Sequence, residues 1–251
     1  LDLKSFIDSI KDDLISDRYI SKEAPQLPQL SALSLNVAQG CNLSCGYCYA
    51  DEGKFQKHSR LMEDEIALRS IDRLFEEAEL LSTITIGFMG GEPLLNRKLL
   101  YKAVEYSSKK ASLTNKQLKF SITTNGTILT EDDIKLFRDH PFNVTISIDG
   151  HPEFHNLNRK THSGKGSYEK VIEGLNLFEK IGRPKHLSAR STVTPLNRGL
   201  VNALNHLIDL KFDDVGFSPV LVSPNPNLAF NENDFENFLV EMIECGNLAM
   251  D

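Results

Sequence analysis

The chain has 251 residues, of which 40% are hydrophobic and 25% charged, and its 35 acidic residues outnumber its 28 basic residues to give a net charge of −7. This composition suits one large globular domain and excludes a basic nucleic-acid footprint over the whole protein. No run is apolar enough for a membrane span, and residues 1–20 are too charged for a secretory signal, so we expect a cytoplasmic protein.

The first part of the chain predicts a short helical extension. The apolar residues that recur there at helical spacing are Leu3, Phe6, Ile7, Ile10, Leu14 and Ile15. A linker with Pro25 and Pro28 follows. We therefore expect an N-terminal helix and linker over residues 1–30, a core domain over 31–230, and a C-terminal helix over 231–251 that either leads to a further extension or closes a protein that works without one.

The core alternates between short β-rich runs and longer segments of helical period. The β-rich runs are Leu33–Ala38, Thr83–Met89, Leu118–Thr124, Asn143–Ile148, Leu187–Thr194 and Val215–Val220. The helical segments include Glu63–Leu80, Asn96–Lys110, Glu131–Arg138, Ser167–Lys180 and Gly199–Leu210. Six strands alternating with helices indicate the α/β class, with parallel βαβ units. Because the runs are fairly apolar, we expect strands covered on both faces, and periodicity alone fits both a doubly wound sheet and a barrel.

The last segment predicts an amphipathic helix that buries a cysteine. Its apolar stripe consists of Phe235, Phe238, Leu239 and Met242, and Cys245 continues that stripe just before Gly246. A buried thiol is therefore a better interpretation of Cys245 than a ligand of a second metal centre.

The distinctive motifs all follow predicted strands. A cysteine loop follows the first run, GGEP (Gly90–Pro93) the second and TNGT (Thr124–Thr127) the third, while SIDG (Ser147–Gly150) ends the fourth and RSTVT (Arg190–Thr194) lies in the fifth. The carboxyl ends of parallel strands face one side of an α/β domain, where functional sites are built. We therefore expect these motifs to share one site.

The cysteine loop, QGCNLSCGYCYA, places Cys41, Cys45 and Cys48 within eight residues. In a reducing compartment, clustered thiols bind metal more often than they form disulfides. A structural zinc ion is bound by four protein ligands, and His58 is a candidate for the fourth. An iron–sulfur cubane takes one ligand per iron, so three cysteines leave one iron open to a substrate or a second cofactor.

The spacing Cys-x3-Cys-x2-Cys with an aromatic residue before the last cysteine, joined to GGEP, TNGT and SIDG, resembles the radical S-adenosylmethionine (radical SAM) enzymes. The resemblance implies a partial (β/α)6 barrel and a 4Fe–4S cluster on Cys41, Cys45 and Cys48, whose open iron chelates the amino and carboxylate groups of SAM. It also implies reductive cleavage of SAM to a 5′-deoxyadenosyl radical that abstracts a hydrogen from the substrate.

The same resemblance implies contacts to SAM from the loop and the second strand. Tyr47 would meet the adenine, although loop packing explains its side chain equally well. The strip Gly90-Gly91 would hydrogen-bond the methionine ammonium, which Glu92 would also reach; a tight turn explains the glycines but not the acidic residue.

Later strands would complete the SAM site. Asn125 would shape the pocket, although Asn-Gly is also a plain turn signal, and Ser147 would contact the ribose or the methionine moiety. Asp149-Gly150 is interpreted mainly as a turn.

A guanidinium group suits the SAM carboxylate because it can form two hydrogen bonds with it. We prefer Arg190, since an unpaired charge inside a strand would be costly, and keep Arg159 as the alternative, whose other role would be to bind an acidic substrate or to brace its loop. Ser167 is expected to cap the fourth of the helical segments named above.

Longer stretches, FMGGEPLLN, SIDGHPEFHNLNRK and GKGSYEKV, resemble the branch of this family that acts on peptides and proteins and carries a SPASM extension. The resemblance implies a peptide or protein substrate, a flavodoxin- or ferredoxin-like electron donor, and the formation of a thioether or carbon–carbon crosslink. We expect the substrate to contact residues 218–227. The alternatives are a non-catalytic subunit that binds SAM or a cluster, and a radical SAM enzyme acting on RNA or a small molecule; the acidic composition argues against RNA.

Overall fold

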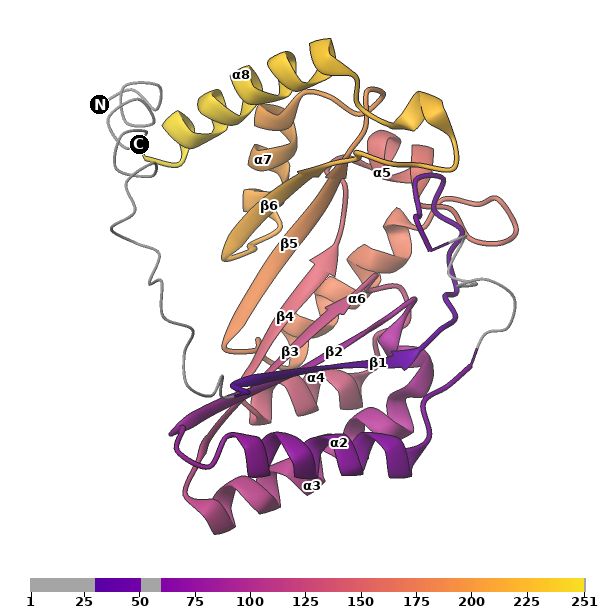
Figure 1. The fold of residues 1–251 in the computed structure, drawn as a ribbon. Coiled ribbons are helices and arrows are strands. Elements are labelled where there is room, and N and C mark those ends of the chain that lie inside the picture. The colour runs from indigo at the N-terminus through magenta and orange to yellow at the C-terminus, as the bar shows by residue number, and fades with distance from the viewer. Residues whose placement is uncertain (1–29, 51–59, 251) are drawn as a thin grey trace, which may run out of the picture.

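A computed structural model describes residues 30–50 and 60–250. Its strands are β1 Ala32–Ala38, β2 Thr83–Gly90, β3 Gln117–Thr124, β4 Phe142–Ser147, β5 His186–Val193 and β6 Asp214–Pro219 (Figure 1). Its helices are α2 Asp64–Glu77, α3 Arg97–Thr114, α4 Glu131–Asp139, α5 Pro152–Asn158, α6 Tyr168–Ile181, α7 Leu200–Asp209 and α8 Glu232–Leu248, with short 3₁₀ helices η2 Pro93–Asn96 and η3 Pro226–Leu228. The helix expected over residues 1–15 lies outside the described residues.

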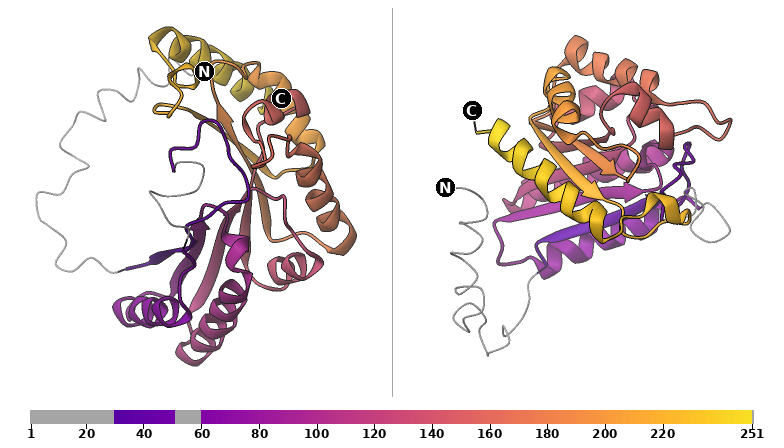
Figure 2. Two further views of the ribbon diagram at one scale, coloured as in Figure 1. Left: turned by 90° about the vertical axis from the view of Figure 1, so that its right-hand side faces the viewer. Right: turned by 90° about the horizontal axis from the view of Figure 1, so that it is seen from above.

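The six strands form one sheet in chain order, β1-β2-β3-β4-β5-β6, and every neighbouring pair is parallel. The sheet curves, with helices along its outer face, and within the described residues β1 and β6 remain unpaired edges (Figure 2). This confirms the α/β class with six βα units, and an open curved sheet agrees with a partial barrel.

The two faces of the sheet differ, which corrects the expectation that both are covered. On β2, Ile84, Ile86 and Phe88 are fully buried under the helices, while Thr85 and Met89 keep solvent contact. Successive side chains of a strand point to opposite faces, so Thr85 and Met89 lie on the inner, concave face. The inner face is open because, among residues 30–50 and 60–250, no helix layer covers that side (Figure 2).

Side-chain caps fix where two of the helices begin. Thr130 and Asp133 form a reciprocal capping box at the start of α4, and Asn231 and Asp234 do the same for α8. Each pair satisfies backbone N–H groups that have no partner within the helix. The starts of α4 and α8 are therefore fixed by local side-chain chemistry.

Helix α8 packs on α7 and buries Cys245 as predicted. The thiol is 5% exposed and packs with Val193, Leu200 and Leu204. Burial raises the pKa of Cys245 to about 11, so the thiol stays protonated at neutral pH. Within ranges 30–50 and 60–250, no helix combines the length and apolarity needed to cross a bilayer.

Candidate cofactor site

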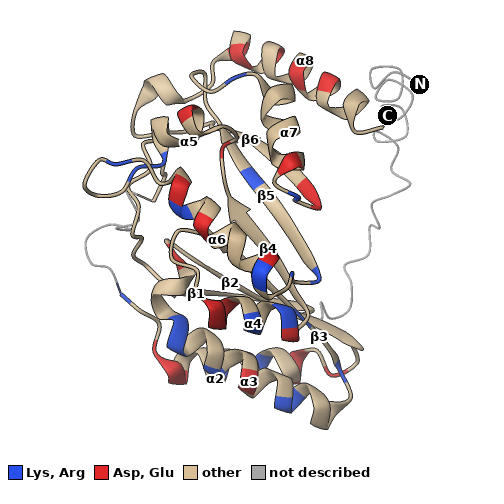
Figure 3. Cartoon of the chain, turned by 180° about the vertical axis from the view of Figure 1, so that it is seen from behind, with Lys and Arg blue, Asp and Glu red and all other residues tan. Residues whose placement is uncertain are grey.

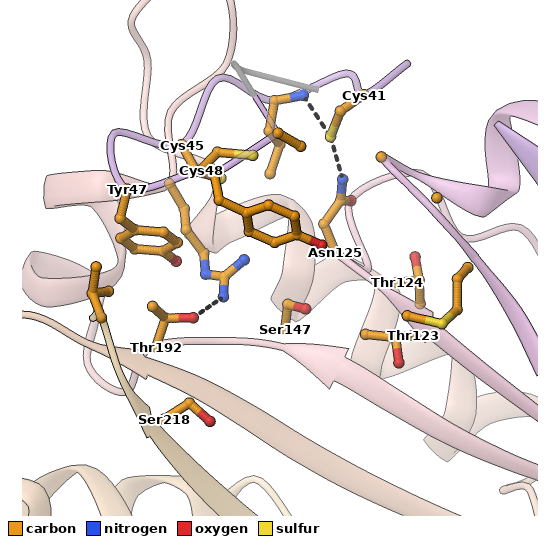
Figure 4. A pocket seen from close by; sticks show the side chains of 18 of the residues that line it. Cys41, Cys45, Tyr47, Cys48, Thr123, Thr124, Asn125, Ser147, Thr192 and Ser218 are labelled. Carbon is orange, nitrogen blue, oxygen red and sulfur yellow. Dashed lines mark hydrogen bonds between the residues drawn. The ribbon is translucent and has the colours of Figure 1, made fainter. Parts of the chain in front are cut away.

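A cavity of about 410 Å³ lies at the carboxyl ends of the strands, a volume within the roughly 300–1,000 Å³ of small-molecule sites. The cysteine loop forms one wall and strand ends form the others (Figure 4). The lining residues that come from expected motifs are Cys41, Cys45, Tyr47, Cys48, Gly90, Gly91, Thr124, Asn125, Ser147, Arg159 and Thr192. The expectation that the motifs share one side of the sheet is therefore confirmed.

The base of the cysteine loop is seated on the end of β2. The N–H of Gly91 donates to the carbonyl of Ala38 at 2.8 Å, and the N–H of Glu92 donates to that of Gly40 at 2.8 Å. A Cβ on Gly90 would lie 2.3 Å from the Ala38 oxygen, and one on Gly91 2.3 Å from the Gly40 oxygen. Both positions therefore require glycine, because the backbone of the cysteine loop lies too close to leave room for a Cβ. From the sequence, the two glycines had been assigned to hydrogen bonding with the methionine ammonium.

The outer part of the loop is held by the last residue of α5 and the segment that follows it. The N–H of Ser44 donates to the carbonyl of Lys160 at 2.7 Å, and that of Gly46 to the carbonyl of Asn158 at 2.9 Å. The loop is therefore fixed by backbone hydrogen bonds at its base and along its outer part, which keeps the three thiols at the cavity.

Asn125 joins the end of β3 to the loop. Its amide nitrogen donates to Oδ1 of Asn42 at 2.9 Å, and the amide nitrogen of Asn42 donates to Oγ1 of Thr127 at 2.8 Å. The hydroxyl and the N–H of Thr127 both donate to Oδ1 of Asn125. This closed set of bonds places Asn125 in the cavity wall and explains the TNGT motif as more than a turn.

The cysteine sulfurs have an environment that suits metal ligands. The N–H of Leu43 lies 3.4 Å from Sγ of Cys41, and Nδ2 of Asn125 lies 3.6 Å from it. Burial raises the pKa of Cys41, and it raises that of Cys45 to about 11. These thiols would therefore need a metal to become thiolates at neutral pH.

A multi-iron cluster fits this arrangement of donors. In the described part of the chain, no three His, Cys, Asp or Glu side chains converge to hold a single metal ion. A 4Fe–4S cluster does not require that convergence, because each thiolate binds a different iron. His58, the candidate fourth ligand for zinc, lies outside the described residues.

Glu92 braces the site and does not belong to the cavity lining, and its contact with SAM stays a prediction. The carboxylate is completely buried and accepts from the hydroxyl of Thr124 at 2.7 Å, from the N–H of Asn125 at 2.8 Å and from the N–H of Leu94 at 3.0 Å. Burial raises the pKa of Glu92 to about 6. Its acceptor atoms thus join the ends of β2 and β3 beneath the cysteine loop.

A buried charge pair that the sequence analysis missed lies behind Tyr47. The Tyr47 hydroxyl donates to Oδ2 of Asp149 at 2.6 Å, and Nε of Arg159 lies 2.9 Å from the same oxygen. The other carboxylate oxygen accepts from the N–H of Thr192 at 2.8 Å. Asp149, interpreted from sequence as a turn residue, therefore links the cysteine loop, the segment after α5 and strand β5. The SIDG motif at a strand end was the available signal.

Arg159 reaches the cavity, whereas Arg190 does not. The Arg159 guanidinium is buried, lies over the Tyr47 ring at 5.5 Å and contacts Oγ1 of Thr192 at 3.4 Å. Arg190 is exposed on the inner face of β5 and is absent from the cavity lining. The cost of burial on which Arg190 was preferred does not arise, because that face of β5 is open.

A second buried chain of hydrogen bonds fixes the backbone of Arg159. Nδ1 of His155 accepts from the N–H of Asp149 at 3.3 Å, and Nε2 of His155 lies 3.0 Å from the hydroxyl of Ser167. That hydroxyl donates to the carbonyl of Arg159 at 2.7 Å. Ser167 does precede α6 as predicted, but its side chain makes no cap bond and serves this network instead.

Two tyrosines of the loop behave differently. Tyr47 is 8% exposed and packs with Val220 and Leu228, as the loop-packing interpretation of its side chain requires. It also lines the cavity. Tyr49 is 83% exposed at the cavity rim. Leu221 and Val222 lie at the same rim, within the segment 218–227 that was expected to meet the substrate.

Comparison with known proteins identifies the family to which this chain belongs. The model of the radical SAM superfamily matches residues 35–206, more than half of the chain. The chain therefore belongs to the radical SAM superfamily, whose enzymes use a 4Fe–4S cluster and SAM. This confirms the family and the cofactors predicted from the motifs.

The chain is homologous to anaerobic sulfatase-maturating enzymes. It is 32% identical over 157 residues to the cysteine-type enzyme of Clostridium perfringens, covering 61% of this chain and 42% of that one. It is 34% identical over 163 residues to the serine-type enzyme of Bacteroides thetaiotaomicron, covering 63% and 39%. The chain thus spans only about two fifths of these curated relatives.

A solved structure shows the same fold. Native anSMEcpe with bound AdoMet and the Cp18Cys peptide superposes with a TM-score of 0.75 at 28% identity, over 86% of this chain and 59% of that one. That protein holds a peptide together with AdoMet.

Proposed function

We propose that this chain is the cofactor-binding part of a radical SAM enzyme that modifies a peptide or protein. The observation that carries the proposal is that Cys41, Cys45 and Cys48 line one cavity together with the GGEP, TNGT and SIDG strand ends. Each of the three thiolates would hold one iron of the 4Fe–4S cluster, leaving the fourth iron open toward the cavity.

The cavity walls offer SAM a set of polar groups. An ammonium group needs acceptors, and because the N–H of Gly91 already donates to Ala38, the Gly90-Gly91 strip offers carbonyl oxygens. Ser147 offers a hydroxyl from the end of β4, and Asn125 forms the adjoining wall. The ring of Tyr47 is the candidate contact for the adenine.

Arg159 is the residue that we assign to the SAM carboxylate. It is a buried cation whose side chain lines the cavity, and the Asp149 carboxylate beside it also accepts from Tyr47 and Thr192. A guanidinium group can bind one carboxylate through Nε and still present its remaining N–H groups to a second.

When bound, the reduced cluster and SAM together supply a carbon radical able to remove hydrogen from an unactivated carbon. The chain's own contribution is to hold the reactants in position and to shield them at the end of the barrel. An external one-electron donor is required, for which a flavodoxin- or ferredoxin-like protein in the cytoplasm is suitable.

A peptide or protein substrate is supported by the relatives, which are named for sulfatase maturation, and by the peptide held in the superposed structure. The open inner face and the apolar rim at Tyr49, Leu221 and Val222 would admit an extended chain. For the product, we propose a thioether or a carbon–carbon crosslink. We also propose the division into residues 1–30, a core of 31–230 and a C-terminal helical part, 231–251.

The test is anaerobic reconstitution with iron, sulfide, SAM and a strong reductant, followed by incubation with candidate precursor peptides. We expect 5′-deoxyadenosine to form and a peptide to lose two hydrogens by mass spectrometry. Cleavage of SAM with turnover of a nucleoside or tRNA, and with all peptides inert, would contradict the assignment. No cleavage of SAM by a fully loaded protein would support a non-catalytic subunit instead.

A further inference from the structure

The inner face of β4, β5 and β6 continues the cavity toward the middle of the sheet. Ser147, Thr192 and Ser218 line the cavity from these three strands. Two residues before Thr192 on the same face of β5 is Arg190, which is paired in register with Ser147 of β4 and Gly216 of β6. Two residues of a strand span roughly 6.6 Å, so Arg190 lies just below the cavity floor.

Arg190 stands out on this face because it is exposed and cationic. Its Nη1 lies 3.2 Å from the place that a Cβ on Gly216 would take, so the missing side chain at Gly216 leaves the guanidinium its room. Among the described residues, no carboxylate lies within ion-pair distance of it. The nearest inner-face acid along β6, Asp214, bonds to His186 instead. The basic segment of β5 is visible in Figure 3.

We propose that Arg190 binds a carboxylate of the substrate peptide. The inference rests on the proposed function, because it requires an extended peptide whose reacting carbon lies beside SAM. A peptide advances roughly 3.3 Å per residue, so a carboxylate roughly two residues from the reacting carbon would reach Arg190. The neighbouring side chains Ser188 and Ser218 are neutral hydroxyls that can bond to a peptide without competing for the cation.

The SAM carboxylate is a poorer partner for Arg190 than a peptide carboxylate. Arg159 already presents a guanidinium inside the cavity, while Arg190 is outside the cavity lining. The Arg190 guanidinium is exposed, unpaired within the described residues and adjacent to the reaction site. It is therefore suited to select peptides that carry a negative charge. The carboxylate would come from an acidic side chain or from the C-terminus of the peptide.

The experiment measures peptide binding by fluorescence anisotropy with the reconstituted protein and SAM, without reductant. The probes are labelled nine-residue peptides with a central cysteine, each with one Glu at a different position, and their Gln twins, all C-terminally amidated. One further Gln peptide has a free C-terminus. The proteins are wild type, Arg190→Gln, Arg190→Lys and the control Lys119→Gln, which changes an exposed inner-face cation on β3.

We expect wild type to bind one Glu peptide, or the peptide with a free C-terminus, about tenfold more tightly than its neutral twin, as for a hydrogen-bonded charge pair. That ratio should fall to about one in Arg190→Gln, recover in part in Arg190→Lys and persist in Lys119→Gln. Affinity for SAM, measured by equilibrium dialysis, should stay within about twofold of wild type in Arg190→Gln, since Arg159 serves the cavity.

Equal binding of charged and neutral twins by wild type would overturn the Arg190 proposal alone, and so would a ratio that survives Arg190→Gln. A tenfold loss of SAM affinity in Arg190→Gln would overturn it in favour of a cofactor contact. Failure of every peptide to bind, in a protein that cleaves SAM, would instead remove the peptide substrate itself, and the Arg190 proposal with it.

Discussion

The Cα of Gly91 lies so close to Gly40 of the cysteine loop that a Cβ on Gly91 would sit 2.3 Å from the carbonyl oxygen of Gly40. Gly91, the second glycine of GGEP, therefore serves mainly to let the cysteine loop pack against the end of β2. The adjoining N–H of Glu92 donates to that same oxygen at 2.8 Å. The position of the cysteine loop, and with it the position of the three thiols, depends on this packing against Gly40.

Replacing Gly91 with Ala should displace the loop. We expect Gly91→Ala to lose about 1–3 kcal/mol of unfolding free energy from overpacking and to take up less iron on anaerobic reconstitution. Urea unfolding and iron analysis are the measurements. Gly246→Ala is the matched control, because nothing lies within 4 Å of a Cβ there and the residue is in helix α8. An iron content in Gly91→Ala equal to that of Gly246→Ala would show that the contact does not position the loop.

The two arginines should separate in a SAM-binding assay. Arg159→Lys keeps the charge but loses the planar fork inside the cavity, so affinity for SAM should fall by about tenfold or more. Arg190→Lys, outside the cavity lining, should bind SAM within about twofold of wild type. Equilibrium dialysis decides between them, and the opposite order would return the carboxylate to Arg190.

Asp149 should couple energetically to Arg159. Asp149→Asn leaves a buried guanidinium without its counter-charge and should cost about 3–5 kcal/mol of unfolding free energy. Adding Arg159→Gln should recover part of this loss, whereas Tyr47→Phe alone should cost about 1.5–3 kcal/mol for one hydrogen bond to a charged group. The double-mutant cycle is measured by urea unfolding. Additive losses would mean that the two groups are not coupled.

Strand positions could be predicted from the sequence because apolar runs and helical segments alternate, and the predicted run Thr83–Met89 differs from β2 by one residue. The open inner face was missed although Thr83, Thr85 and Gly87 already alternate with apolar residues. The sequence does not show which face of the sheet the helices cover, so it could not show whether Arg190 is buried or exposed. The role of Asp149 depends on partners 102 residues away at Tyr47 and 43 away at Thr192, which only the fold brings together.

His155 should make stability depend on pH. Burial lowers the pKa of His155 to about 3, whereas a histidine of the unfolded chain has a pKa of about 6.5. The unfolded chain therefore binds the extra proton between these values, and stability falls as the pH drops below about 6.5, by about 2 kcal/mol at pH 5. Urea unfolding at pH 7.5 and pH 5 should show wild type losing that much more than His155→Gln. Parallel losses would contradict a buried neutral His155.

The measurement that bears most directly on the cofactor site is electron paramagnetic resonance of the anaerobically reconstituted and reduced protein, with and without SAM, alongside iron and zinc analysis. Wild type and Cys245→Ala should hold about four irons per chain and show a cluster signal that changes when SAM is added. Cys41→Ala, Cys45→Ala and Cys48→Ala should each lose that signal, because each thiolate holds a different iron. Tightly bound zinc in the anaerobically purified wild-type protein, with no iron taken up on reconstitution, would contradict the account.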